Sequence, residues 1–284
     1  MTSTPTGCAV IVEPRQHKAL KFVIETALPH LPPDWPIQLF HGTQNEEYVR
    51  RELSALLESK RILLHNMNVT NLTRTMYSQM FTSADFWEKC VGEHVLIFQT
   101  DSTFLPTSPH KLTDFLQWDY IGAPWYDKKV GNGGFSLRKK SSSLAAVKAM
   151  TESQKQSVKN NQMHEDGYFV NFFKHHPVYR LAPLGEAQKF SVEGMYYDKP
   201  LGVHQPWSYI NWIGGQNYQK LVMSNPVLQQ LLRLNNQPLP NVNQQSASSK
   251  KRLKARTPRV TASKRPHRPV LRAKSLTTRF RRRR

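Results

Sequence analysis

The segment Val95-Leu-Ile-Phe-Gln-Thr-Asp101-Ser102 places four apolar residues shortly before a lone carboxylate. Short apolar runs of this kind are typical of buried strands in a parallel sheet. Three similar runs come earlier in the chain, at residues 8–12, 36–40 and 61–64, and helical patterns lie between them. Strands that alternate with helices predict a mainly parallel sheet wound by right-handed crossovers. The sequence therefore predicts an α/β fold.

After residue 98 the alternation becomes less regular. Helices are expected at 16–28, 44–58, 71–90, 108–116, 142–151, 165–175 and from 225, and further strands at 120–123 and 135–138. The helix at 71–90 is expected to break or bend near Ser83. The polar stretch 151–163 is expected to be an exposed loop. One folded domain is predicted over residues 8–235. A disordered linker and Lys/Arg-rich tail are predicted over 236–284, where few apolar residues are available to offset chain entropy.

The net charge of +20 is concentrated at the C-terminus. Residues 250–284 contain 16 of the 40 Lys and Arg and no acidic residue, which leaves 24 basic against 20 acidic residues before them. The basic character therefore belongs to the tail and not to the body of the protein. Such a tail is either a solubilising or targeting segment or a site that binds nucleic acid or another polyanion. The residues of such a binding site would be Lys250, Lys251, Arg252, Arg281, Arg282, Arg283 and Arg284.

The sequence offers no disulfide framework and no membrane span. The two cysteines, Cys8 and Cys90, form no CxxC pattern, and no stretch approaches 18 consecutive apolar residues. The first residues lack the pattern of a secretory signal. We therefore expect a soluble intracellular protein, cytoplasmic or nuclear, or associated with the virion if its source is a virus.

Four polar features follow the strands in a defined order. Asp101 ends a buried strand, where α/β sheets bind ligands, and a carboxylate there can ligate Mg²⁺ or Mn²⁺. A glycine turn at residues 131–134 allows close backbone approach, and Glu165-Asp166 opens a helix and offers a general base. His204 lies in a loop with Pro206 and Trp207. Taken singly, each also has a structural interpretation: a helix cap, a hairpin turn, a first-turn acidic pair and a hydrogen-bonded histidine.

Taken together, these segments resemble the GT-A glycosyltransferase pattern. The closest resemblance is to an uncharacterised GT-A-type family found in large DNA viruses and some eukaryotes, and it covers about residues 8–210. It rests on the segments 98–102 (FQTDS), 119–125 (DYIGAPW), 131–138 (GNGGFSLR), 165–166 (ED), 190–193 (FSVE) and 202–204 (GVH). It implies a GT-A-like single domain that acts as a hexosyltransferase, moving a sugar from a nucleoside-diphosphate donor to an acceptor hydroxyl.

The resemblance also assigns roles to residues. The metal-binding DxD motif corresponds to Gln99-Thr100-Asp101, with an amide in the first acidic position, and His204 resembles the histidine that completes the metal site, so Mn²⁺ or Mg²⁺ is implied. The acidic pair resembles that of inverting transferases, which makes Glu165 and Asp166 the catalytic candidates and Asp166 the candidate base.

The remaining predicted site residues concern the donor, a UDP- or GDP-sugar in this interpretation. The resemblance places the nucleotide base and ribose against the first strand, which contributes Val10, Val12, Glu13 and Arg15. With Asp101, Gly133 and Gly134, these residues make up the predicted donor-binding set. The acceptor is left open by the sequence.

Two other functions compete with this one. The missing first acid of the motif favours a catalytically inactive GT-A-like protein that binds nucleic acid or another polyanion through its tail, whereas the presence of Asp101, Asp166 and His204 opposes it. A nucleotidyltransferase is a third possibility, because similar sheets handle nucleoside phosphates. Its product would be pyrophosphate and not a nucleoside diphosphate.

Overall fold

The computed structural model describes residues 5–240 of the 284-residue chain. The predicted polyanion-binding residues of the tail, from Lys250 to Arg284, lie outside the described residues. None of the helices among residues 5–240 combines the length and the apolar character needed to cross a bilayer.

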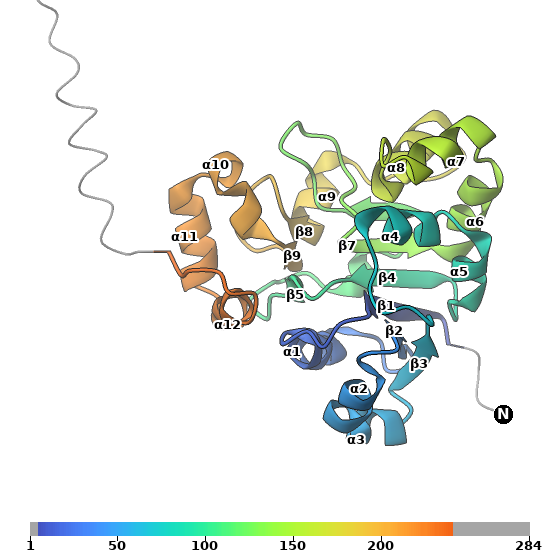
Figure 1. Ribbon diagram of the computed structural model, residues 1–284. Helices are drawn as coiled ribbons and strands as arrows, with labels where there is room; N and C mark the ends of the chain where they lie inside the picture. Colours follow the sequence, from blue (N-terminus) through green and yellow to red (C-terminus); the bar gives the residue numbers. More distant parts are fainter. Residues whose placement is uncertain (1–4, 241–284) are drawn as a thin grey trace, which may run out of the picture. The chain divides into compact units, whose positions relative to one another are not determined.

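A six-stranded central sheet forms the core of the fold, with the strand order β3-β2-β1-β4-β7-β6 (Figure 1). Its strands are β1 (Gly7–Glu13), β2 (Ile37–His41), β3 (Ile62–Asn66), β4 (His94–Phe98), β6 (Tyr120–Gly122) and β7 (Phe135–Lys139). The first four pair in parallel, and their positions match the predicted apolar runs. The predicted α/β class with a mainly parallel central sheet is therefore confirmed.

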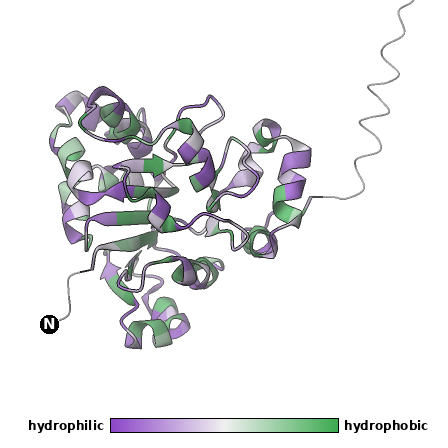
Figure 2. Cartoon of the chain, turned by 180° about the vertical axis from the view of Figure 1, so that it is seen from behind, coloured by the Kyte–Doolittle hydropathy of each residue, from purple (hydrophilic) through white to green (hydrophobic). Residues whose placement is uncertain are grey.

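Helices pack on both faces of this sheet, because its inner strands are apolar on both sides. In β1, Ala9 and Ile11 enter one core cluster while Cys8 and Val10 enter the other. The helices of this first half are α1 (Leu20–Ala27), α2 (Glu46–Glu52), α3 (Ser54–Glu58), α4 (Arg74–Phe81) and α5 (Ala84–Lys89), with a 3₁₀ turn at Leu28–His30. Figure 2 shows apolar residues concentrated along the central strands. Continuous burial of this kind is expected for a sheet covered by helices on both faces.

Strand β7 runs antiparallel between β4 and β6. Its first residue, Phe135, therefore pairs with Phe98, the last residue of β4. This register brings the glycine turn at residues 131–134 to the sheet edge where β4 ends, beside Asp101. The sequence predicted both strands but not their relative direction.

A second, three-stranded sheet has the order β5-β9-β8. It consists of β5 (Ser102–Phe104), β8 (Ser191–Val192) and β9 (Gly202–His204). Ser102 pairs with His204 in antiparallel register, so the histidine is placed next to the residue that follows Asp101. Pairing across about a hundred residues thus joins two of the sequence features into one site.

The expected helices 44–58 and 71–90 are each divided in the structure, the first into α2 and α3 and the second into α4 and α5. Two other expected elements change in kind. Residues 151–163, expected as a loop, contain helix α7 (Glu152–Lys159). Thr151 and Gln154 form a capping box at its start, and among its residues only Val158 is buried, so the segment reads as polar although it is helical. The helix expected at 108–116 is reduced to one 3₁₀ turn, Leu112–Phe115, which begins after the loop that follows Pro109.

The other helices lie in the second half of the chain. They are α6 (Lys140–Lys148), α8 (Glu165–His175), α9 (Leu184–Phe190), α10 (Ile210–Ile213), α11 (Gly215–Met223) and α12 (Pro226–Leu234), with a 3₁₀ turn at Pro206–Tyr209. Helices α8 and α12 were expected close to these positions, whereas α9, α10 and α11 were not predicted. Helix α8 packs its aromatic side chains against the sheet, and its N-terminus faces the glycine turn.

Candidate active site

Two neighbouring cavities lie at the edge of the sheet where β1 and β4 end. One, of about 390 Å³, is lined by Val12, Glu13, Arg15 and Asp101, and we call it the β1 cavity. The other, of about 300 Å³, is lined by the glycine turn, the start of α8 and His204, and we call it the α8 cavity. Both share the lining residues Arg74, Tyr77, Gln99 and Gln205, so together they form one groove.

The predicted site residues divide between these cavities, with one exception. Val10 is completely buried in the core and lines neither cavity, so only its neighbour Val12 reaches the groove from that strand. Glu13 lines the β1 cavity but is already paired, because Arg15 donates to it from Nε at 2.7 Å and from Nη2 at 2.8 Å. Of the first strand's candidates, Arg15 is the one that is mostly exposed to solvent.

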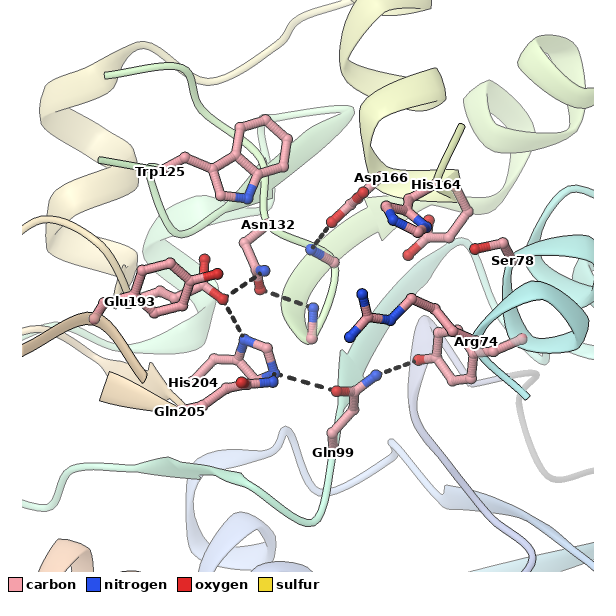
Figure 3. Close-up of a pocket in the computed structure, with 15 residues that line it drawn as sticks. Arg74, Ser78, Gln99, Trp125, Asn132, His164, Asp166, Glu193, His204 and Gln205 are labelled. Atoms are coloured by element: carbon pink, nitrogen blue, oxygen red, sulfur yellow. Dashed lines mark hydrogen bonds and ion pairs between the residues drawn. The ribbon is translucent and has the colours of Figure 1, made fainter. Parts of the chain in front are cut away.

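Asp101, His204 and Glu193 form a row of ionisable groups at the bottom of the groove. His204 Nε2 lies 3.4 Å from Asp101 Oδ1. On the other side of the ring, Nδ1 lies 2.9 Å from Glu193 Oε1 (Figure 3). Burial lowers the pKa of His204, but the two carboxylates outweigh burial and raise the pKa to about 10. In the absence of another cation, the histidine therefore carries the positive charge that the two acids require.

This row fits a divalent cation only as part of a larger ligand set. Within residues 5–240, no group of three or more His, Cys, Asp or Glu side chains is arranged to hold a metal ion. However, Asp101 Oδ1 is buried without a hydrogen-bond partner there, and Gln99 Oε1 lies 3.2 Å from the same histidine nitrogen. A cation that takes its other ligands from phosphate and water, as Mg²⁺ commonly does, fits these atoms.

The glycine turn is fixed to this row by close contacts. A side chain at Gly134 would overlap the imidazole of His204, and one at Gly133 would overlap the carboxylate of Glu165. Asn132 connects the turn to the row, since its Nδ2 donates to Glu193 Oε1 at 2.8 Å and its Oδ1 accepts from the Gly134 N–H at 2.9 Å. Glycine is thus required here because the backbone lies directly against site side chains.

Glu165 is committed to a buried ion pair. Arg138 of β7 donates to both of its oxygens, from Nη1 at 2.7 Å and from Nη2 at 3.1 Å, and both side chains are buried. The guanidinium also lies over the ring of Tyr120, 4.7 Å from its centroid. A bidentate pair of this kind holds the start of α8 to the sheet. Both oxygens of Glu165 are therefore occupied by Arg138, and its predicted catalytic role stays a prediction.

Asp166 lies beside this ion pair and faces the α8 cavity (Figure 3). Its Oδ2 accepts from the Gly133 N–H at 3.2 Å and its Oδ1 from the Gly167 N–H at 2.7 Å. Burial raises the pKa of Asp166, and the hydrogen bonds from Gly167 and Gly133 and the charge of Arg138 partly offset this rise. The carboxylate is half-buried, so it can still reach a bound molecule.

Several groove residues were not proposed as site residues from the sequence. Arg74, at the start of α4, is exposed, lines both cavities and has no ion-pair partner among the described residues (Figure 3). Tyr77 accepts a hydrogen bond from Gln99 Nε2 at 2.8 Å, and this contact orients the Gln99 amide in the groove. Glu193 belongs to a recognised segment, FSVE, but nothing in the sequence indicated its contact with His204.

Residues 61–204 match the model of a family described as "Protein of unknown function (DUF5672)", and this segment makes up half of the chain. The chain belongs to this family. The segment matched by DUF5672 includes Asp101, the glycine turn, Asp166 and Glu193, and it ends at His204. It begins after β1 and β2, so the predicted nucleotide-binding strand lies outside the match. No curated protein matches the chain significantly.

Solved structures that are similar to this DUF5672 protein include three glycosyltransferases. The apo form of GlyE from Streptococcus pneumoniae TIGR4 has a TM-score of 0.48 and 13% identity, over 70% of this chain and 54% of that one. The mannosyltransferase PcManGT from Pyrobaculum calidifontis, solved with GDP-Man and Mn²⁺, has a TM-score of 0.46 and 11% identity, over 82% of this chain and 70% of that one. The bifunctional glycosyltransferase WbbM has a TM-score of 0.43 and 8% identity, over 82% of this chain and 52% of that one. The chain thus spans about half the length of GlyE and of WbbM.

Proposed function

We propose that this protein is a glycosyltransferase that moves a sugar from a nucleoside-diphosphate donor to an acceptor hydroxyl. The observation that carries the proposal is the continuity of the groove. The carboxylate at the end of β4, Asp101, lies in one cavity, and the carboxylate at the start of α8, Asp166, lies in the other. Four lining residues are common to both cavities, so a donor bound at one end presents its sugar at the other.

The β1 cavity suits the nucleotide part of a UDP- or GDP-sugar. Val12 and Pro14 offer apolar surface, and Arg15 and Thr100 offer polar contacts beside it. Arg74 lies at the junction of the two cavities, where its guanidinium can bind diphosphate oxygens without first leaving a carboxylate. Asp101 and His204, with Gln99, would hold Mn²⁺ or Mg²⁺ against the same diphosphate. When bound, such a cation would neutralise charge that develops on the leaving group.

In this proposal, Asp166 would act as the base on the acceptor. It would accept the proton of the acceptor hydroxyl as the hydroxyl oxygen bonds to the sugar's anomeric carbon. The bond from that carbon to the phosphate oxygen breaks, and the nucleoside diphosphate leaves with the electron pair. The hydrogen bonds from Gly133 and Gly167 orient the carboxylate for this role. Base catalysis of this type contributes about 10²–10⁴-fold to rate.

The proposal is tested by measuring product release from a panel of UDP- and GDP-sugars with Mn²⁺ or Mg²⁺. We expect the full chain to release nucleoside diphosphate slowly by hydrolysis, and chelation or Asp101→Ala to suppress the release. Asp198→Ala is the matched control, because Asp198 is an exposed carboxylate that lines neither cavity. Release of pyrophosphate would instead indicate nucleotidyl transfer. Absence of any release, with and without added saccharide or peptide acceptors, would contradict the proposal.

A further inference from the structure

Two large aromatic side chains contact each other in a tilted arrangement at the protein surface. Tyr126, in the loop between β6 and β7, and Trp212, in α10, have ring centroids 4.9 Å apart at an interplanar angle of 30°. They are 55% and 53% exposed, respectively, although both are large side chains that normally gain stability from burial. Exposed aromatic surface of this kind on a folded protein is typical of a binding site.

This pair is continuous with the α8 cavity. Trp125, the neighbour of Tyr126, lines that cavity, and so does Tyr209, whose ring centroid is 5.8 Å from that of Trp212. Figure 3 shows Trp125 beside the cavity that holds Asp166. We call Trp125, Tyr126, Tyr209 and Trp212 the aromatic platform. It extends from the proposed base outward to solvent.

The loop backbone that carries Trp125 and Tyr126 of the platform is held in place on both sides. Trp125 N–H donates to the Lys129 carbonyl at 2.8 Å, and a bridge joins Pro124 to Val130, so the β6–β7 loop is closed at its base. Gly194 packs directly against the backbone of Tyr126. The backbone of this loop is therefore already ordered before a ligand binds to Trp125 or Tyr126, which lowers the entropy cost of binding.

We propose that the aromatic platform binds a saccharide, and that the acceptor of the reaction is therefore a glycan. The C–H bonds on one face of a pyranose ring form an apolar surface that packs on an aromatic ring, while its hydroxyl groups require polar partners. The platform offers the rings, and the α8 cavity beside it offers Asp166 and the Tyr209 hydroxyl. Sites that combine aromatic walls with a few polar groups are typical of small polar ligands.

The position of the platform distinguishes it from a nucleobase site. The nucleotide end of the groove lies at the β1 cavity, and none of the platform residues lines that cavity. The platform adjoins the opposite end, beside the proposed base, where the acceptor hydroxyl must be. The assignment of the saccharide as acceptor rests on the proposed function, whereas saccharide binding to the platform does not.

Saturation-transfer NMR on the full chain with methyl glycosides of glucose, galactose, mannose and N-acetylglucosamine tests the inference. We expect transfer to ring protons of at least one glycoside. Trp212→Ala should weaken its binding roughly three- to tenfold, and Trp212→Phe should largely preserve it. Met223→Ala, which removes an exposed apolar side chain in α11, is the control and should change nothing. Tyr126→Ala is the second platform variant if Trp212→Ala does not fold.

Donor hydrolysis by the same variants separates the two proposals. We expect the bound glycoside to accelerate nucleoside diphosphate release in the wild type and in the Met223→Ala control, and to leave release by Trp212→Ala without this acceleration. Donor hydrolysis without saccharide binding, or saccharide binding that is unchanged in both platform variants, would contradict the inference that the platform binds a saccharide. Saccharide binding that depends on the platform, without any donor hydrolysis, would support the platform as a saccharide site and contradict the proposed glycosyltransferase function. Acceleration by hydroxyl-containing peptides alone would overturn the glycan acceptor.

Discussion

The adjacent acids Glu165 and Asp166 should respond to the same chemical change in opposite ways. Replacing either carboxylate with its amide, Glu165→Gln or Asp166→Asn, preserves shape and removes one negative charge. Glu165 receives two hydrogen bonds from the buried guanidinium of Arg138, at 2.7 and 3.1 Å. Asp166 receives only backbone N–H groups and faces the groove. One substitution therefore removes a buried charge partner, and the other removes the proposed base.

The expected magnitudes follow from these environments. Removing one partner of a buried ion pair costs about 3–5 kcal/mol, because the remaining charge has no compensation. For a domain of this size, that cost lowers Tm by roughly 6–20 °C. Asp166→Asn retains an oxygen that can accept the backbone hydrogen bonds, and loss of its favourable position at a helix N-terminus costs at most about 1 kcal/mol. Its turnover should nevertheless fall by about 10²–10⁴-fold.

Thermal unfolding by circular dichroism and transfer rates measured per folded molecule separate the two effects. Glu165→Gln should melt early yet retain much of its turnover at temperatures where it is folded. Asp166→Asn should melt like the wild type and be nearly inactive. If Glu165→Gln has the wild-type Tm and no turnover, while Asp166→Asn remains active, the assignment of the two acids is reversed.

Three further predictions concern the groove. Arg74→Ala should reduce kcat/KM for the donor roughly ten- to a hundredfold, because charge-assisted hydrogen bonds to the donor are lost. Arg233→Ala, on the exposed side of α12, is the control and should leave kcat/KM unchanged in the same kinetic assay. Gly134→Ala should push the adjacent imidazole away and suppress transfer, and it should destabilise the fold by about 1–3 kcal/mol in denaturant titrations. Gly185→Ala is the control, because Gly185 has open space around it in α9, and this substitution should not destabilise the fold. Because burial raises the pKa of Asp166 and a base must be unprotonated, kcat/KM should fall as pH decreases through that raised pKa, and a pH–rate profile without this acidic limb would contradict the role of the carboxylate.

Much of the fold was readable from the sequence because its signals are local. The apolar runs at β1, β2, β3 and β4 are continuous, as strands buried on both faces must be, and the helices between them repeat at helical spacing. The same reasoning failed at α7. A helix that buries only Val158 gives no periodic signal, although its capping residues Thr151 and Gln154 were visible in the sequence.

The site was predictable only in part, for a different physical reason. Asp101, Asp166 and His204 line one groove, as their order along the chain suggested. Their neighbours depend on long-range pairing. The two-residue strand β8 places Glu193 beside the histidine, and so short a strand has no sequence pattern of its own. Arg74 belongs to the groove only because α4 packs near the end of β4, which no local signal indicates.

The charges around His204 explain how the motif can carry an amide at Gln99. Asp101 and Glu193 already lie at the two ring nitrogens, at 3.4 and 2.9 Å, and Gln99 Oε1 lies 3.2 Å from one of them. A carboxylate in place of that amide would add a third negative charge to a buried cluster that has one cationic side chain, and like charges at such distances are costly. Glu193 thus places a second carboxylate beside His204 although residue 99 is an amide, and we propose that Asp101 and Glu193 together give the donor site its negative charge.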